Sequence, residues 1–161
     1  MEGNDIFCKL YPVWAKLGWV IAQNEHAYSI YCVTPSNPGH ALIMPRQHVQ
    51  VLAELAPEAA HGFNQLEVAT FQTLKEKHFR DSKYLIPIYE EMSSNPKGFD
   101  PKFAAAMLSH PHLCAPPLGR MVGSNLDDIA GRTVPHYHLN MFLQYDDKKK
   151  GIANAVREYL K

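Results

Sequence analysis

The chain of 161 residues is the size of one domain and is long enough to bury a core. Its 16 lysines and arginines balance 16 aspartates and glutamates, so no overall field attracts nucleic acid or a membrane, and an anionic ligand must be held locally. Three widely spaced cysteines, an acidic N-terminus without a secretory pattern and the lack of a long apolar run predict a cytoplasmic protein without disulfides.

The first part of the chain predicts three strands. Residues 19–22 and 27–33 are rich in apolar and aromatic residues, with a turn between the two runs. A dense cluster of turn residues follows at 34–39. The third strand is then expected at 40–44, where Pro45 ends it.

The main helix is predicted over residues 57–79. Pro57 suits a first helical turn, and apolar residues recur on one face at Ala59, Phe63, Leu66 and Leu74. Gly62 weakens this helix and marks an alternative start. Three histidines lack any motif around them and are interpreted as surface residues, namely His26, His61 and His78.

The second part of the chain is less regular. A loop at 93–98 and a short helix at 103–108 are expected, followed by prolines that interrupt regular structure. Two antiparallel strands, at 121–123 and 135–145, complete the sheet. A C-terminal helix follows the lysines at 148–150, which are better explained as a solvated cluster than as a phosphate contact.

The most informative stretch is TVPHYHLNMF, residues 133–142. Successive side chains of a strand alternate between its faces, so His136, His138 and Asn140 share one face. Tyr137, Leu139 and Met141 then face the core. Imidazole serves as a nucleophile or proton carrier near neutral pH, and two imidazoles on one face therefore indicate a site.

These residues and an earlier segment resemble the histidine-triad (HIT) superfamily of nucleotide hydrolases and transferases. The sequence Gly131-Arg132-Thr133-Val134 is similar to the family's Gly-Gln-Thr/Ser-Val turn, which lies between an Asn, here Asn125, and the histidine strand. The sequence PGHALIMPRQH, residues 38–48, resembles the second family signature. Two separate motifs in the family's order argue against chance.

The resemblance implies an α+β, HIT-like fold, in which a mostly antiparallel sheet packs against one long helix, with a C-terminal helix in addition. We expect a single domain over residues 1–161. Compact family members need few residues between helix and next strand, so residues 83–118 are interpreted as an insertion. Insertions of this kind either shape substrate choice or are inert, and the sequence leaves both open.

The resemblance also assigns roles to residues of the site. His138 matches the nucleophile that forms a nucleotidyl-histidine intermediate, and its other ring nitrogen would donate to the carbonyl of His136. His40 matches a further histidine that supports the first one. The positions that would contact phosphate are Asn125, the Gly131 amide and Thr133.

Three positions depart from the family pattern. Asn140 replaces the third histidine and can donate a hydrogen bond but cannot deliver a proton. In this it resembles the nucleotidyltransferase branch of the superfamily, which also has a side-chain amide at this position. Arg132 replaces the turn glutamine and either holds a second phosphate or faces solvent. Cys32 stands where the family has its ribose-binding aspartate, and a thiol is a poor partner for a diol.

The sequence therefore predicts a nucleotide-phosphate hydrolase or nucleotidyltransferase that acts through His138. The alternative is a non-catalytic HIT-like domain that binds a nucleotide or a protein, and the three departures favour it. The expected partners are a nucleotide or nucleoside phosphate and, by resemblance, a second copy of the chain. Nucleic acid and membrane are not expected.

No cofactor is required for the transfer step. Some family members hold structural zinc through Cys-x-x-Cys and two histidines, and here the candidates are Cys8 and His48. Asp5 stands at the position of the other cysteine, and this loss of a thiolate argues against zinc. The triplet at 110–112, His-Pro-His, resembles the site of the uridylyltransferase branch, but no phosphate-binding turn precedes it.

Overall fold

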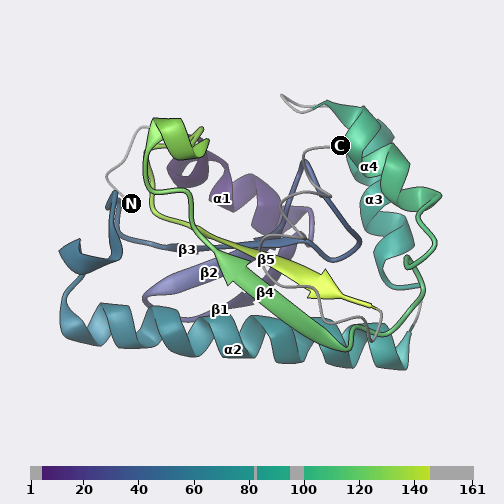
Figure 1. Ribbon diagram of the computed structural model, residues 1–161, viewed down its shortest axis with the longest axis horizontal. Coiled ribbons are helices and arrows are strands. Elements are labelled where there is room, and N and C mark those ends of the chain that lie inside the picture. Colours follow the sequence, from purple (N-terminus) through teal and green to yellow (C-terminus); the bar gives the residue numbers. More distant parts are fainter. Residues whose placement is uncertain (1–4, 82, 95–99, 146–161) are drawn as a thin grey trace.

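The computed structural model of the chain describes residues 5–81, 83–94 and 100–145. Its centre is a five-stranded antiparallel sheet with the order β1-β2-β3-β5-β4 (Figure 1). The strands are β1 (Val20–Gln23), β2 (Ala27–Tyr31), β3 (Ala41–Pro45), β4 (Gly119–Gly123) and β5 (Leu139–Gln144). Because β5 pairs with β3, the two sequence motifs lie side by side.

Helices cover the sheet. They are α1 (Ile6–Lys16), α2 (Pro57–Arg80), α3 (Leu85–Ser94) and α4 (Pro101–Leu108), with 3₁₀ turns at Leu52–Glu54 and Asp128–Ala130. The long helix α2 runs along one side of the sheet and α1 lies on the other side (Figure 1). Every residue of β2 and β3 is buried between these layers. This arrangement confirms the predicted α+β fold, in which a mostly antiparallel sheet packs against one long helix. The predicted C-terminal helix falls outside the described residues.

The helix α1 was not predicted from the sequence. The carboxylate of Asp5 begins it by accepting hydrogen bonds from the amides of Phe7, at 2.7 Å, and Cys8, at 3.1 Å. Phe7 and Trp14, one heptad apart, are buried on the same side. Both the cap and the spacing are visible in the sequence, but Pro12 inside the helix obscures them.

The helix α2 begins at Pro57, as predicted, and not at the alternative start. Gly62 lies inside this helix, where a Cβ atom would collide with the ring of His26. The glycine therefore permits close packing of α2 on the β1–β2 turn. His78 is buried, with 3 % of its surface exposed, so its interpretation as a surface residue was wrong. Its place on α2 follows the same stripe as Leu74, which the sequence had assigned to the core.

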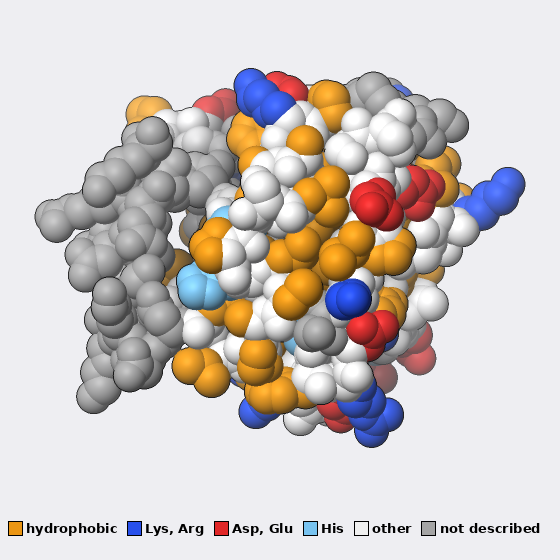
Figure 2. Space-filling model, turned by 90° about the vertical axis from the view of Figure 1, so that its right-hand side faces the viewer, with side chains coloured by type: hydrophobic (Ala, Val, Ile, Leu, Met, Phe, Trp, Pro, Cys, Tyr) orange, Lys and Arg blue, Asp and Glu red, His pale blue; other side chains and the backbone are white. Residues whose placement is uncertain are grey.

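Two helices, α3 and α4, occupy residues 83–118 and pack against each other. The shorter helix, α4, was predicted from the sequence, whereas α3 was not. The hydroxyl of Tyr89 on α3 accepts a hydrogen bond of 2.7 Å from the amide of Gly39, so this region supports the turn that precedes β3. On the side of the molecule where α3 and α4 lie, apolar side chains gather centrally with charges of both signs around them (Figure 2). No described helix is long and apolar enough to cross a membrane.

The turn at Gly39 allows a first prediction. Gly39 has φ +73°, and a Cβ atom there would lie 2.5 Å from Cδ1 of Leu143. Replacing Gly39 by alanine is expected to lower the free energy of unfolding by about 1–3 kcal/mol, through backbone strain and overpacking. Urea denaturation measures the loss. Gly18 is the matched control, because its φ is +74° but nothing lies within 4 Å; an equal loss there would show that packing on Leu143 contributes nothing.

Candidate active site and candidate metal site

The first feature of the site is the hydrogen bond that fixes the ring of His138. Its Nδ1 lies 2.8 Å from the backbone oxygen of His136, and a carbonyl oxygen can only accept, so Nδ1 carries the proton. The other nitrogen, Nε2, then holds a free electron pair, and no described residue forms a hydrogen bond with it. Burial, together with the nearby His136 and Arg132, lowers the pKa of His138. The ring is therefore neutral at pH 7.

The second feature is the contact between His40 and Asn140. Antiparallel pairing of β3 with β5 sets Leu42 opposite Asn140, and His40 Nε2 lies 3.2 Å from Asn140 Oδ1. His40 also stacks on Phe142, with ring centroids 4.4 Å apart. The expected support of His136 by His40 is thus replaced by support of Asn140. The ring of His136 instead bonds to the carbonyl of Pro45, at 2.9 Å.

The third feature is the turn that follows β4, where Ser124 and Asn125 donate hydrogen bonds to backbone carbonyls. Ser124 Oγ donates a 2.7 Å hydrogen bond to the carbonyl of His138, a contact that sequence reasoning missed although Ser124 precedes the motif Asn. Asn125 Nδ2 donates to the carbonyl of Gly131 at 3.3 Å. The Gly131 amide, which was expected to contact phosphate, donates to the backbone carbonyl of Asp128 within the turn, at 2.9 Å.

Arg132 lies over this turn. Its guanidinium approaches Asp128, at 3.6 Å, and Gln50, at 3.4 Å, and 15 % of its side chain is exposed. The Nε atom is buried and has no partner among the described residues. Because its charge also lowers the pKa of His138, Arg132 adds a positive potential beside that ring.

The position of Cys32 excludes a sugar contact by its thiol. Cys32 is 4 % exposed at the end of β2, and its Sγ lies 3.7 Å from Oγ1 of Thr34. Burial raises the pKa of this thiol to about 11. The residue is therefore a neutral part of the core.

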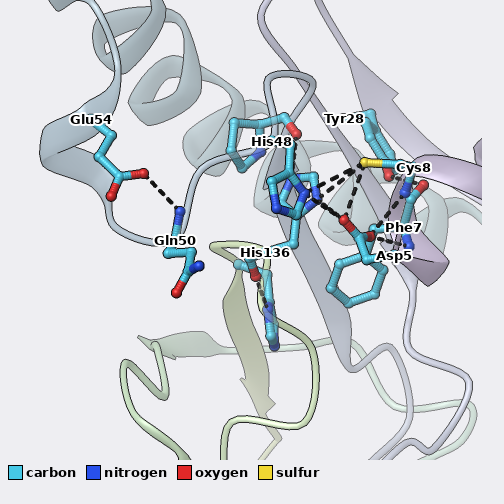
Figure 3. A network of polar contacts seen from close by, with 10 residues as sticks. Asp5, Phe7, Cys8, Tyr28, His48, Gln50, Glu54 and His136 are labelled. Atoms are coloured by element: carbon cyan, nitrogen blue, oxygen red, sulfur yellow. Dashed lines mark hydrogen bonds and ion pairs between the residues drawn. The ribbon is translucent and has the colours of Figure 1, made fainter. Parts of the chain in front are cut away.

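A second cluster lies where the beginning of α1 meets the segment that precedes β5 (Figure 3). Asp5, Cys8, His48 and His136 each offer one ligand atom, and the four atoms lie within 4.8 Å of one another. Asp5 Oδ2 is 2.6 Å from His48 Nδ1 and 3.2 Å from His136 Nδ1. Cys8 Sγ is 3.6 Å from His136 Nδ1 and 3.8 Å from His48 Nδ1.

The protonation of this cluster suits a cation. Burial alone would raise the pKa of Asp5, but hydrogen bonds from Cys8 and the adjacent His136 outweigh burial and lower it to about 2. Nε2 of His136 donates to the carbonyl of Pro45, and Nδ1 lies 3.2 Å from Asp5 Oδ2. A cation that displaced the proton between Nδ1 and Asp5 would therefore gain both atoms as ligands. Carboxylate, thiol and two imidazoles are a donor set that zinc accepts. The chain therefore has a candidate Cys/His/Asp metal site.

The structure thus joins the two weak metal candidates of the sequence, Cys8 and His48, and adds Asp5 and His136. An open hollow of about 490 Å³ lies beside this cluster. Its lining consists of Asp5, Ile6, His48, Thr133, Val134 and Pro135. Thr133, a predicted phosphate contact, is exposed there, whereas His138 lies outside this lining.

The buried histidines give a pH prediction. Burial is the main reason why the pKa of His40 falls from 6.5 to about 4, and the pKa of His138 is also lowered. Between pH 6.5 and 4 the unfolded chain therefore binds more protons than the folded chain, and stability is lost as the pH falls. His40 alone is expected to lower the free energy of unfolding by about 2 kcal/mol between pH 7 and pH 5. Denaturation at both pH values tests this; His40→Asn should flatten the dependence, whereas a substitution of the exposed His61 should retain it.

Comparison with known proteins confirms the predicted HIT-like fold. A family model described as HIT domain matches residues 18–146. Solved structures with a similar fold include a hypothetical protein from Leishmania major (20 % identity, 99 % of this chain and 96 % of that chain covered, TM-score 0.55). A histidine triad protein from Clostridium difficile has 17 % identity and a TM-score of 0.52, with 94 % of this chain and 100 % of that chain covered. A HIT family hydrolase from Clostridium thermocellum has 19 % identity and a TM-score of 0.50, with 94 % of this chain and 99 % of that chain covered. None of the curated proteins compared with the chain matches it. The family model spans most of the sequence, and the chain belongs to the HIT family.

Proposed function

We propose that the protein is a nucleotide-phosphate hydrolase or nucleotidyltransferase that acts through a transient adduct on His138. The observation that carries this proposal is the 2.8 Å bond from His138 Nδ1 to the backbone of His136. It leaves Nε2 with the electron pair that attack on phosphorus requires. The P–N bond forms as the bond to the leaving group breaks, and water or an acceptor hydroxyl then releases the nucleotide.

Other residues would hold the phosphoryl oxygens and the leaving group. Arg132 supplies positive charge, and Asn125 and Thr133 supply donors at the turn between β4 and β5. Asn140, two residues beyond His138, would meet the leaving group.

Trapping of the adduct tests the proposal. The protein is incubated with radiolabelled dinucleoside polyphosphates, nucleoside phosphoramidates and nucleotide sugars, quenched rapidly in alkali because phosphohistidine bonds are acid-labile, and digested. Label is expected on the peptide that contains His138. Label on the 110–112 triplet, or at any other residue, would contradict the proposal.

A non-catalytic HIT-like domain that binds a nucleotide or a protein is the second candidate. It is favoured by the burial of His138, which is 8 % exposed and makes an edge contact with the ring of Phe7, at a centroid distance of 5.1 Å. A catalyst must let phosphorus reach Nε2, whereas a binding domain need not. Nucleotide binding measured by calorimetry, without turnover of any compound in the panel, would favour this candidate.

We further propose that the cluster of Asp5, Cys8, His48 and His136 binds zinc. Their ligand atoms converge, and Asp5 takes the place of the second cysteine. Bound zinc would connect the start of α1 to the segment that precedes β5. Its contribution would be structural, because each of the four residues would be a protein ligand.

The remaining expectations concern the assembly of the chain. We propose a single domain over residues 1–161 with an insertion at 83–118, and a homodimer formed through α2 and the edge strand β4. Val68 on α2 is 44 % exposed and Val122 on β4 is 38 % exposed, which supports an apolar contact there. Light scattering on the purified chain measures the assembly.

A further inference from the structure

The orientation of the Asn140 amide is determined by its neighbour. His40 accepts a 3.2 Å hydrogen bond from the backbone amide of Ser36 through Nδ1. Since an amide N–H can only donate, Nδ1 of His40 carries no proton. The neutral ring therefore carries its proton on Nε2, which lies 3.2 Å from Asn140.

This proton decides which end of the Asn140 side chain faces His40. An Nε2–H donor requires an acceptor, and the amide oxygen of Asn140 is the acceptor; its NH2 group is not. The NH2 group consequently points away from His40, and no described residue accepts a hydrogen bond from it. Asn140 follows His138 by two residues, so the contact with His40 joins the PGH segment to the end of the histidine motif.

The turn around residues 36–40 holds His40 rigidly. The ring is 3 % exposed and stacks on Phe142, and the backbone before it is bonded to Tyr89 through Gly39. A ring held in this way has one available orientation. Asn140 then has one orientation too, with its two N–H donors directed away from His40.

We propose that His40 is a positioning residue that makes Asn140 a permanent hydrogen-bond donor, and that the site is thereby restricted to leaving groups that depart as anions. This inference rests on the proposed function. An amide N–H stabilises negative charge on a departing oxygen but transfers no proton. Phosphate and pyrophosphate groups depart with the electron pair of the broken P–O bond and need no proton at pH 7. Amines and simple alcohols need one. The substrate class is therefore phosphoanhydrides, such as dinucleoside polyphosphates or nucleotide sugars, and not phosphoramidates.

The substrate restriction is tested with adenosine 5′-phosphoryl compounds that differ only in the leaving group: a phosphate, a series of substituted phenols and an amine. For the wild-type protein, kcat/KM is expected to fall steeply as the leaving group becomes more basic, with the amine about 10²–10⁴-fold below the anhydride. Asn140→His restores an acid and is expected to raise turnover of the amine by about 100-fold. Asn140→Asp has the same shape but lacks the donor, and it should lower turnover of the anhydride by about 100-fold or more.

The role of His40 has two tests, one of which needs no activity. Proton–nitrogen NMR of the wild-type protein identifies the protonated ring nitrogen, and we expect Nε2; a proton on Nδ1 would overturn the positioning role. In kinetics, His40→Ala should lower turnover of the anhydride about tenfold but have no further effect in an Asn140→Ala background, because both act through one amide. Additive losses would show that His40 acts otherwise.

Failure of the inference is distinguishable from failure of the proposed function. Turnover that depends on His138 but not on the basicity of the leaving group would refute the substrate restriction and retain the adduct. Absence of turnover and of adduct with every compound would refute both. The NMR measurement decides the orientation of Asn140 in either case.

Discussion

Replacement of His138 by alanine is expected to reduce kcat/KM for the nucleotide substrate by at least about 10³-fold, with kcat reduced more than KM is changed. The reason is that Nε2 of His138 would form the bond to phosphorus, whereas binding of the phosphate depends on Arg132 and the neighbouring turn. Steady-state kinetics with the compound that is turned over fastest measure both constants.

A matched control separates chemistry from folding. His61 is exposed on α2, and its replacement by alanine should leave kcat/KM within about twofold of the wild-type value. Circular dichroism of the His138→Ala variant should show the native spectrum. Turnover that persists in this variant would refute the adduct on His138.

Loss of zinc binding on replacement of Cys8 by serine is the second large effect. The wild-type chain is expected to bind one Zn²⁺, and Cys8→Ser should lower the affinity at least about 100-fold, because a hydroxyl replaces the thiolate. Zinc at a thousand times its dissociation constant would stabilise the wild-type fold by about 4 kcal/mol. Competition with a chromophoric chelator measures affinity, and thermal unfolding measures stability.

The chain provides its own control for this experiment. Cys114 is exposed and does not belong to the cluster, so Cys114→Ser should bind zinc as the wild type does. Equal weakening by both substitutions would indicate nonspecific thiol binding. Absence of zinc binding by the wild-type protein would refute the proposed metal site.

Much of the fold could be predicted from the sequence, because helices, strands and turns have local sequence patterns. The runs at 19–22 and 27–33, the turn before β3 and the long helix after Pro57 were found from periodicity and turn residues. The histidine strand was placed too early: β5 begins at Leu139, after both histidines. The residues that precede it bond to neighbouring segments instead of a strand partner, as Tyr137 does through its amide to Val49.

The candidate site could be predicted only in part, because its contacts join residues that lie far apart in the sequence. His138 and Asn140 stand out within one short motif. The approach of Cys8 to His136 spans 128 residues, and no local pattern encodes it. His40 was expected beside His136, whereas its ring lies 3.2 Å from Asn140, a contact between residues 100 positions apart that no local pattern encodes.

The tyrosine contact beneath the Gly39 turn has a consequence for variants of this chain that lack part of residues 83–118. Tyr89 is fully buried, and its hydroxyl is the acceptor for the Gly39 amide. Deleting α3 would strand that amide in an apolar environment, at a cost of about 1–3 kcal/mol unless water entered. A shortened homologue must therefore provide a substitute acceptor at this turn, and grafting the two helices elsewhere would not reproduce their effect.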